Sequence, residues 1–227
     1  MPTRLATFWD LVPSARILAA AFRDEPLMGP IIHPRREQYP NDMHLFFLRM
    51  LRMAFYSGPD HVHLVAYDDE VGHQSITGYA HWVRKRSAPR KQTFYQRLMS
   101  KTMSIYNYLE SWVMPNRAAD PAKAEILTHL DPLLQQHLVG RREECWYLSL
   151  LGVDPNVHKS GQGRQLVSYG LEQARIEGIP AGLVASKPAE GFYRRLGFDV
   201  ELGGIGEVTG MHNPFVDVEG GLVMFTK

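Results

Sequence analysis

Two short segments carry residue types that could hold a phosphate-bearing cofactor and act on it. Gly161-Gln-Gly163 follows the apolar run 144–153 and precedes an amphipathic segment, which predicts a tight turn from a strand into a helix. Glycines let backbone N–H groups approach a pyrophosphate, and the first helical turn adds unpaired N–H groups and a positive dipole end. Tyr193 follows Gly163 by thirty residues and is a phenol that could donate a proton.

Each segment also has a purely structural interpretation. The dinucleotide motif G-x-G-x-x-G is incomplete because Leu166 occupies its third glycine position, and no Gly-Lys-Ser/Thr follows as in a P-loop. The glycines could therefore form an ordinary strand-to-helix turn, and Tyr193 could be a core residue whose hydroxyl is satisfied. His158, Lys159 and Arg164 favour phosphate, since they add positive charge beside the turn.

Hydrophobic periodicity predicts the elements that must position these residues. Before the glycine turn it favours the following order: a strand at 5–9, helices from Pro13 and over 40–55, strands 61–67 and 75–84 around a turn at 68–73, two helices within 87–141, and a buried strand at 144–153. After the turn come a helix at 161–177 with Gly178 as its C′ residue, a strand at 181–186, a helix at 189–196 closed by Gly197, and strands 198–202 and 222–225. We expect one domain over 1–227, with 87–141 as a helical insertion.

Composition excludes several classes of protein. The 227 residues carry a formal net charge of +1, so no overall field favours nucleic acid. No apolar run approaches the roughly 20 residues that cross a bilayer. We expect no membrane partner and a cytoplasmic location. The basic cluster 84–86 with 90–91 is expected to be a solvated loop, and it leaves nuclear targeting open.

Cysteine and histidine usage argues against disulfide and metal chemistry. Cys145 is the only cysteine, so no internal disulfide can form, and we expect this thiol to be structural. His61 and His63 fall on one strand face and His81 on the neighbouring strand, but no H-E-x-x-H spacing is present. We therefore predict no metal site.

The two segments together resemble the GNAT superfamily of acyl-CoA-dependent N-acetyltransferases. The strand 147–153 with its turn through Gly161-x-Gly163 is similar to that family's coenzyme A motif, and Phe192-Tyr193-x-x-Leu-Gly-Phe198 to its second motif. The resemblance covers 145–202 and is greatest to fungal and puromycin-type members. It implies an α/β (α+β) fold, with a mixed, mostly antiparallel sheet whose fourth and fifth strands splay apart between flanking helices.

The same resemblance assigns a cofactor and residues to hold it. The donor would be acetyl-CoA, bound without a metal and held by the following residues: Leu151, Gly152, Val153, His158, Lys159, Ser160, Gly161, Gln162, Gly163, Arg164, Ser186 and Phe192. The chain departs from the family pattern in having His158 where Gln or Arg is usual, and Val184 where fungal members often have Glu.

The implied reaction is direct attack of a small-molecule amine on the thioester, with Tyr193 protonating the leaving thiolate. Asp24 and Glu25, at the end of the first helix, would contact the acceptor. The general base stays open among Glu143, Glu144, Asp154, Asp24, Glu25 and a water relay. Two alternatives also stay open, an acyl-CoA sensor without turnover and an O-acyltransferase, and the chain could be a monomer or a homodimer.

Overall fold

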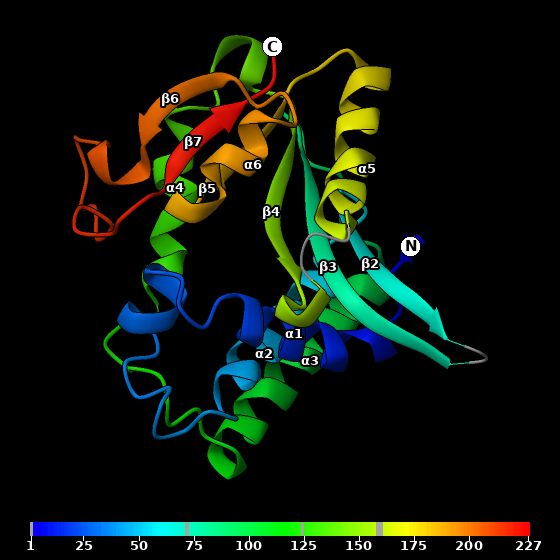
Figure 1. The fold of residues 1–227 in the computed structure, drawn as a ribbon, viewed down its shortest axis with the longest axis vertical. Helices are drawn as coiled ribbons and strands as arrows, with labels where there is room; N and C mark the ends of the chain where they lie inside the picture. The colour runs from blue at the N-terminus through cyan, green and yellow to red at the C-terminus, as the bar shows by residue number, and fades with distance from the viewer. Residues whose placement is uncertain (1, 71–72, 124, 158–160) are drawn as a thin grey trace.

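A single seven-stranded sheet organises the protein. The computed structural model describes residues 2–70, 73–123, 125–157 and 161–227. The strand order is β1-β2-β3-β4-β5-β7-β6, and every neighbouring pair is antiparallel except β4 and β5, which run parallel (Figure 1). The strands are β1 Thr3–Leu5, β2 His61–Glu70, β3 His73–Lys85, β4 Cys145–Val153, β5 Ala181–Ala185, β6 Val200–Gly204 and β7 Leu222–Phe225. This is the mixed, mostly antiparallel sheet that the sequence predicts.

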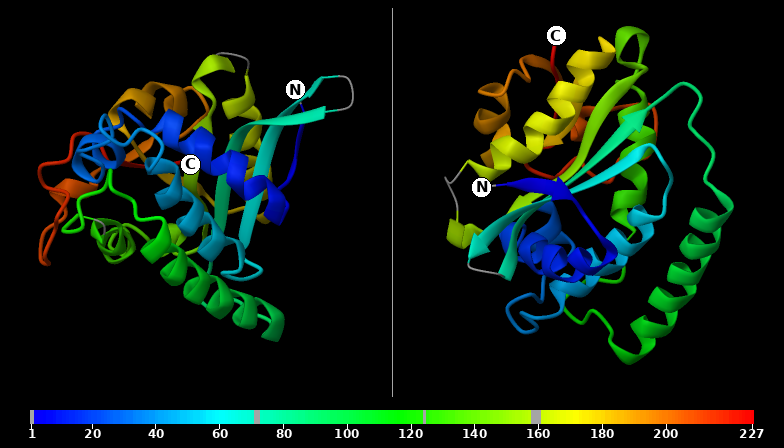
Figure 2. Two further views of the ribbon diagram at one scale, coloured as in Figure 1. Left: turned by 90° about the horizontal axis from the view of Figure 1, so that it is seen from below. Right: turned by 90° about the vertical axis from the view of Figure 1, so that its right-hand side faces the viewer.

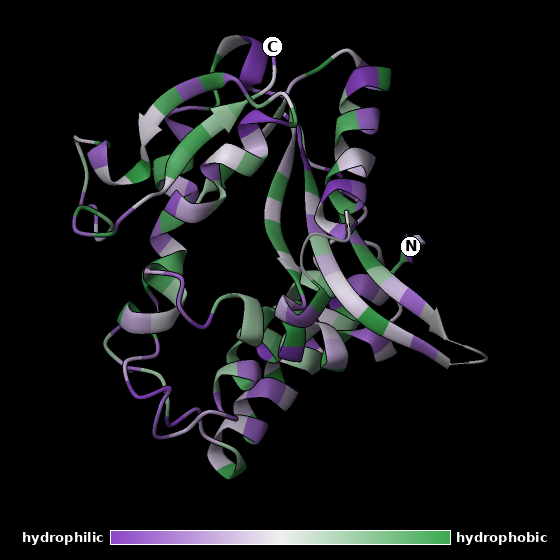
Figure 3. Cartoon of the chain, viewed as in Figure 1, coloured by the Kyte–Doolittle hydropathy of each residue, from purple (hydrophilic) through white to green (hydrophobic). Residues whose placement is uncertain are grey.

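Helices cover both faces of the sheet (Figure 2). They are α1 Leu11–Ala21, α2 Met43–Phe55, α3 Phe94–Val113, α4 Leu130–Gln135, α5 Gln162–Glu177 and α6 Glu190–Arg194. Residues of α1, α2 and α4 share one apolar core with the face of the sheet that carries Val65 and Tyr79. Residues of α5 and α6 share a second core with the face that carries Trp82 and Trp146. The strand period of two separates these faces, and β4 is hydrophobic along most of its length because it is covered on both (Figure 3).

The boundaries differ from the sequence predictions where side chains form local turns. The strand expected at 5–9 was wrong beyond Leu5, because Phe8–Asp10 forms a 3₁₀ turn. The Asp10 carboxylate accepts hydrogen bonds from the backbone N–H and hydroxyl of Thr7 and pairs with Arg4 at 2.7 Å, which turns the chain toward α1. The turn expected at 68–73 was wrong at 68–70, since these residues extend β2 and pair with β3.

Residues 87–141 contain two helices, as predicted, which differ greatly in their environment. α3 has no buried residue and runs along the outside of α2 (Figure 2). α4 is a six-residue helix preceded by a 3₁₀ turn at Ile126–His129, and it buries Leu133 and Leu134 in the first core. None of the described helices is long and apolar enough to span a bilayer.

Close packing of α5 against β3 generates a prediction about stability. A Cβ at Gly170 would lie 2.3–2.4 Å from three ring atoms of Trp82, which is fully buried. We expect Gly170→Ala to lower the free energy of unfolding by about 1–3 kcal/mol, since overpacking outweighs the helix propensity of alanine. Gly191→Ala is the matched control, because its nearest neighbour would be a flexible Arg195 nitrogen at 3.5 Å. Urea unfolding of both variants is the measurement, and equal midpoints would contradict the packing argument.

Candidate active site

The pairing between β4 and β5 stops halfway along β4. The two strands pair at Trp146↔Ala181, Tyr147↔Gly182 and Leu148↔Leu183, and no further pair follows. β4 continues for five residues beyond Leu148, while the end of β5 pairs only with β7. The splayed fourth and fifth strands of the sequence prediction are thereby confirmed. We call residues 149–153 the open edge of β4.

A β-bulge coincides with the start of the open edge. On the other side of β4, Trp82 pairs with Leu148 but His81 pairs with Leu150, so Ser149 is the extra residue. Ser149 is exposed, although its neighbours Leu148 and Leu150 are buried. A bulge bends a strand and increases its twist, which is the deformation needed to separate β4 from β5.

The ladder shows which backbone groups face the open edge. The Asp154 N–H donates to the Thr77 carbonyl of the β3 side at 2.8 Å. Antiparallel ladders alternate, so the N–H and C=O groups of Leu151 and Val153 point away from β3. These are two of the residues predicted to bind a cofactor, and they offer an extended ligand the hydrogen bonds that a strand would make.

The glycine turn lies at the N-terminus of α5. Gly161 is its N-cap residue with φ of 85°, a left-handed conformation that glycine adopts at little cost. Helix geometry leaves the N–H groups of Gly163 and Arg164, in the first turn of α5, without intrahelical acceptors. The predicted cofactor residues His158, Lys159 and Ser160 lie outside the described residues. Helix N-termini of this kind bind anions in many proteins, so phosphate binding at this turn stays a prediction.

The two sequence motifs meet in space. A Cβ at Gly163 would lie 3.4 Å from the Phe192 ring and 3.7 Å from a Val153 methyl group, so the turn, α6 and the open edge are in contact. Ser186 follows β5 directly and is half-buried, and its carbonyl accepts from the Ala189 N–H at 2.9 Å. The structure therefore brings Val153, Gly163 and Phe192 together, and their role in binding a cofactor stays a prediction.

Tyr193 lies in the core beneath this contact. Its ring packs edge-on against Phe192 and Phe198, and only 8% of the residue is exposed. Burial raises the pKa of Tyr193 above its ordinary value of 10, so the phenol is protonated at every physiological pH. Burial also raises the pKa of Tyr147 of β4, and the proximity of Tyr193 adds to the rise, so the two phenols lie near each other.

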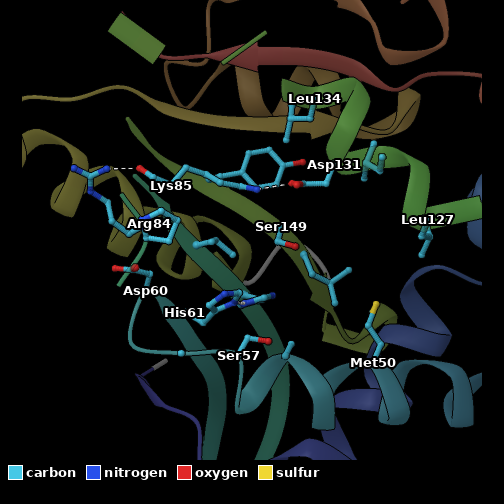
Figure 4. Close-up of a pocket in the computed structure, with 18 of the residues that line it drawn as sticks. Met50, Ser57, Asp60, His61, Arg84, Lys85, Leu127, Asp131, Leu134 and Ser149 are labelled. Atoms are coloured by element: carbon cyan, nitrogen blue, oxygen red, sulfur yellow. Dashed lines mark hydrogen bonds and ion pairs between the residues drawn. The ribbon is translucent and has the colours of Figure 1, made fainter. Parts of the chain in front are cut away.

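A cavity opens on the opposite face of the sheet. This central cavity, of about 580 Å³, reaches Tyr147, Ser149 and Leu150 at the start of the open edge. Its walls come from α2, β2, β3, β4 and the segment 127–135 of the insertion (Figure 4). Most lining side chains are aliphatic, among them Met50, Leu51, Leu127, Leu130, Leu134 and Leu150. Lys85 and Asp131 pair across one side of it at 2.5 Å (Figure 4).

Two histidines line this cavity as a hydrogen-bonded pair. Nδ1 of His61 lies 3.0 Å from Nε2 of His81, and the rings are stacked at 5.2 Å. From sequence, His61 and His81 are predicted to lie on adjacent strands, but these histidines are weighed only as metal ligands. No group of three histidine, cysteine or acidic residues in the described part of the chain is arranged to hold a metal ion.

The carboxylates considered from sequence have other partners or positions. Glu25 accepts from the backbone N–H groups of Leu27 and Met28, and burial raises its pKa while these bonds oppose the rise. The Asp24 side chain is 85% exposed and lies 3.9 Å from Arg36. Neither residue lines the central cavity, so their contact with an acceptor stays a prediction.

The basic cluster is a solvated loop only in part, since Arg84 and Lys85 belong to β3 whereas Arg90 and Lys91 are exposed in the following loop. Arg84 is buried and pairs with Glu144 and Glu177, each at 2.7 Å. Its hydrogen bond lowers the pKa of Glu144, which therefore stays an ionised partner. Glu177 also accepts from the Trp146 indole at 2.9 Å, so this network ties β3, β4 and α5 together where β4 is still paired with β5.

Cys145 is excluded as a nucleophile by its surroundings. It is fully buried in the first core, and burial raises the pKa of its thiol to about 12. A neutral thiol at physiological pH is a poor nucleophile. The sequence prediction of a structural cysteine agrees with this position.

Comparison with known families agrees with this geometry. The family model described as Acetyltransferase (GNAT) family matches residues 32–198. The chain belongs to the GNAT family. An acetyltransferase from the fungus Stachybotrys chartarum is 22% identical over 211 residues, which cover 93% of this chain and 83% of that one.

Solved structures share the GNAT fold over almost the whole chain. One from Corynebacterium glutamicum, named histone acetyltransferase HPA2 and related acetyltransferase, has a TM-score of 0.57 at 20% identity and covers 99% of this chain and 94% of its own. The polyamine N-acetyltransferase of Drosophila melanogaster has a TM-score of 0.54 at 15% identity and covers 99% and 97%. At these identities the likeness concerns the fold, and the acceptor has to be argued from the site.

Proposed function

We propose that this GNAT acetyltransferase transfers an acetyl group from acetyl-CoA to the primary amine of a small molecule with an apolar body. The observation that supports this most directly is that the open edge of β4 and the central cavity meet at one residue. The open edge of β4 begins at Ser149, and Ser149 also lines the central cavity. A donor along the edge and an acceptor in the cavity would therefore meet at the bulge.

Backbone groups would hold the donor. The outward N–H and C=O groups of Leu151 and Val153 would bind the pantetheine arm as if it were a strand. The N–H groups at the start of α5 would bind the pyrophosphate, with Phe192 against the arm. An N–H of the open edge near Leu151 would stabilise the oxyanion that develops on the thioester carbonyl.

The cavity favours an apolar acceptor. Its charged lining groups are already paired, since Asp60 binds Arg86 at 2.9 Å and Asp131 binds Lys85. A polyamine would need unpaired carboxylates along its length, whereas the aliphatic walls suit an alkyl or arylalkyl group. The amine would then point toward Ser149 and the thioester.

Tyr193 would complete the reaction as general acid. The leaving thiolate has a pKa of roughly 8.5 by analogy with cysteine, and the phenol holds its proton above that range. Transfer would proceed in a ternary complex without a covalent intermediate, in agreement with the buried state of Cys145.

The function is tested by thiol release from acetyl-CoA with a panel of acceptors. We expect turnover with 2-phenylethylamine and hexylamine, at least tenfold slower turnover with spermidine and a lysine peptide, and none with 2-phenylethanol. Calorimetric binding of coenzyme A without any thiol release would favour the sensor alternative, and turnover of the alcohol would favour O-acylation.

A matched pair of variants distinguishes, in this assay, an effect on acceptor binding in the cavity from a general effect of adding a tryptophan. Leu130→Trp fills the cavity, so it should raise KM for the amine at least tenfold and leave KM for acetyl-CoA unchanged. Ile176→Trp places the same side chain at a 63% exposed position on α5 and should change neither constant. Equal effects of both variants would contradict the placement of the acceptor.

Tyr193→Phe tests the acid role. We expect kcat to fall about 10²-fold, with coenzyme A affinity retained, because only the proton donor is lost. In the wild type, kcat should not decline between pH 7 and 9, since the raised pKa keeps the phenol protonated there. Tyr169→Phe is the control, a half-buried tyrosine of α5 packed on Trp146. Unaltered kcat in Tyr193→Phe would remove the acid role and leave a packing residue.

A further inference from the structure

We propose that the pair His61–His81 accepts the proton that the acceptor amine loses, with Nε2 of His61 as the receiving atom. The inference rests on the proposed function, because it requires an amine in the central cavity. It supplies a candidate for the general base, which the sequence leaves open. The argument follows from register, hydrogen bonding and surroundings.

Strand register places the pair beside the point of reaction. His81 of β3 is the register partner of Leu150, the residue that follows the bulge at Ser149. His61 is the first residue of β2 and hydrogen-bonds His81 from the next strand. His61, His81, Ser149 and Leu150 all line the central cavity, where Figure 4 shows His61 and Ser149 on the same wall.

The hydrogen bond between the rings leaves one nitrogen ready to accept. The contact between Nδ1 of His61 and Nε2 of His81 requires one N–H and one lone pair. When Nδ1 of His61 carries the proton, Nε2 of His61 presents its lone pair. No hydrogen bond joins this Nε2 to any residue in the described parts of the chain, so an amine in the cavity could use it.

His63 holds the pair in place and takes no part in proton transfer. Its Nε2 lies 3.2 Å from the Ala54 carbonyl, which accepts only, so Nε2 carries the proton. Its Nδ1 then accepts from the Tyr79 hydroxyl at 2.6 Å. The ring stacks on His81 at 4.4 Å with 9° between the planes, which fixes the orientation of His81.

The surroundings keep both rings neutral at pH 7, as a base requires. Burial lowers the pKa of His61 and of His81, Lys85 lowers that of His61 further, and Asp60 partly opposes the change. The other titratable groups that face the cavity are Arg84, Arg86 and Arg90 from β3 and its following loop, Asp131 from α4 and Tyr147 from β4. Asp60 is paired with Arg86 and Asp131 with Lys85, so no unpaired carboxylate among the described cavity residues raises the pKa of the histidines again.

The step is balanced in atoms and charge. The amine nitrogen bonds to the thioester carbonyl carbon, and the proton on that nitrogen passes to Nε2 of His61. The Nδ1 proton of His61 can then move to Nε2 of His81, which spreads the charge over two rings. The carbon–sulfur bond breaks, and sulfur takes the proton of Tyr193. The products are the N-acetyl amine and the free thiol of coenzyme A.

The pH dependence of kcat/KM for His61→Gln tests the proposal. When kcat/KM is expressed per neutral amine, a base with a lowered pKa is active from below about pH 6.5 upward, so the wild-type value should stay constant down to that region. On the same scale, His61→Gln should lose about 10²-fold in kcat/KM at pH 7, and its residual value should rise about tenfold per pH unit as hydroxide replaces the missing base. His129→Gln, an exposed histidine outside the cavity, should match the wild type.

Chemical rescue distinguishes a proton acceptor from a packing residue. Added imidazole should restore at least tenfold of the activity of His61→Ala, and should not change Tyr193→Phe. A His61→Gln enzyme with the wild-type pH profile, or His61→Ala without rescue, would overturn the proton-acceptor role while the acetyl transfer stands. Absence of thiol release by the wild type would overturn both.

Helix α3 carries an independent observation. Nine of its large apolar side chains are at least 49% exposed, including Phe94 at 80% and Trp112 at 74%. Such a concentration of exposed apolar side chains on one helix marks an interaction surface. We infer that α3 pairs antiparallel with α3 of a second copy of this chain.

The outward face of α3 is complementary to itself when reversed. Its inner side faces α2 through Glu110, which binds Arg49 and Arg52, and at 100° per residue the opposite side carries positions 94, 98, 101, 105, 108 and 112. Reversal about position 103 places Phe94 against Trp112, Leu98 against Tyr108 and the aliphatic stem of Lys101 against Ile105. A two-fold axis needs one surface to fit itself in this way.

Sedimentation equilibrium and cysteine crosslinking test this interface. We expect a dimer that Ile105→Glu converts to a monomer with unchanged circular dichroism, whereas Ser104→Glu, exposed on the flank of α3, stays dimeric. A mixture of Phe94→Cys and Trp112→Cys chains should form a mixed disulfide that neither forms alone. A wild-type protein that is monomeric at 100 μM would overturn the inference. It would also be overturned if the monomer sedimented with anionic vesicles and this binding required α3.

Discussion

The loss of pairing between β4 and β5 after Leu148 is the constraint on which the rest of the site depends. A sheet normally leaves unpaired backbone groups only at its outer strands. Here the bulge at Ser149 creates such an edge in the middle of the sheet. Once the edge exists, the glycine turn, Phe192 and Tyr193 surround it from one face, and the central cavity meets it from the other.

The two halves of the site are built on different physical principles. On the proposed donor side, the groups offered are mainly backbone N–H and C=O, whose directions follow from helix and strand geometry. On the proposed acceptor side, side chains from β2, β3, α2 and the insertion define the shape and charge of the cavity. The first half therefore has a strong sequence signature, and the second depends on contacts between residues far apart in the chain.

This difference explains how much the sequence could predict. The turn at Gly161, the αL position of Gly178 and the buried strand β4 follow from local rules, and all three are present. The bulge could not be foreseen, because Ser149 becomes an extra residue only through its register with His81. The pairing of His61 with His81 needs the same long-range information. Glu25 looked available in sequence, but only the structure shows that its carboxylate binds the following turn.

An unfilled row of backbone groups also links occupancy to folding. Between β4 and β5 the backbone groups of the open edge could pair with one more strand. An extended ligand there would form those hydrogen bonds, and it would therefore stabilise the sheet as well as serve as substrate. A ligand that binds the folded chain and not the unfolded one shifts the folding equilibrium by mass action. The melting temperature of this protein should thus rise with the strength of ligand binding along the open edge of β4. A thermal screen would then rank donors by their ability to complete the sheet before any reaction is measured.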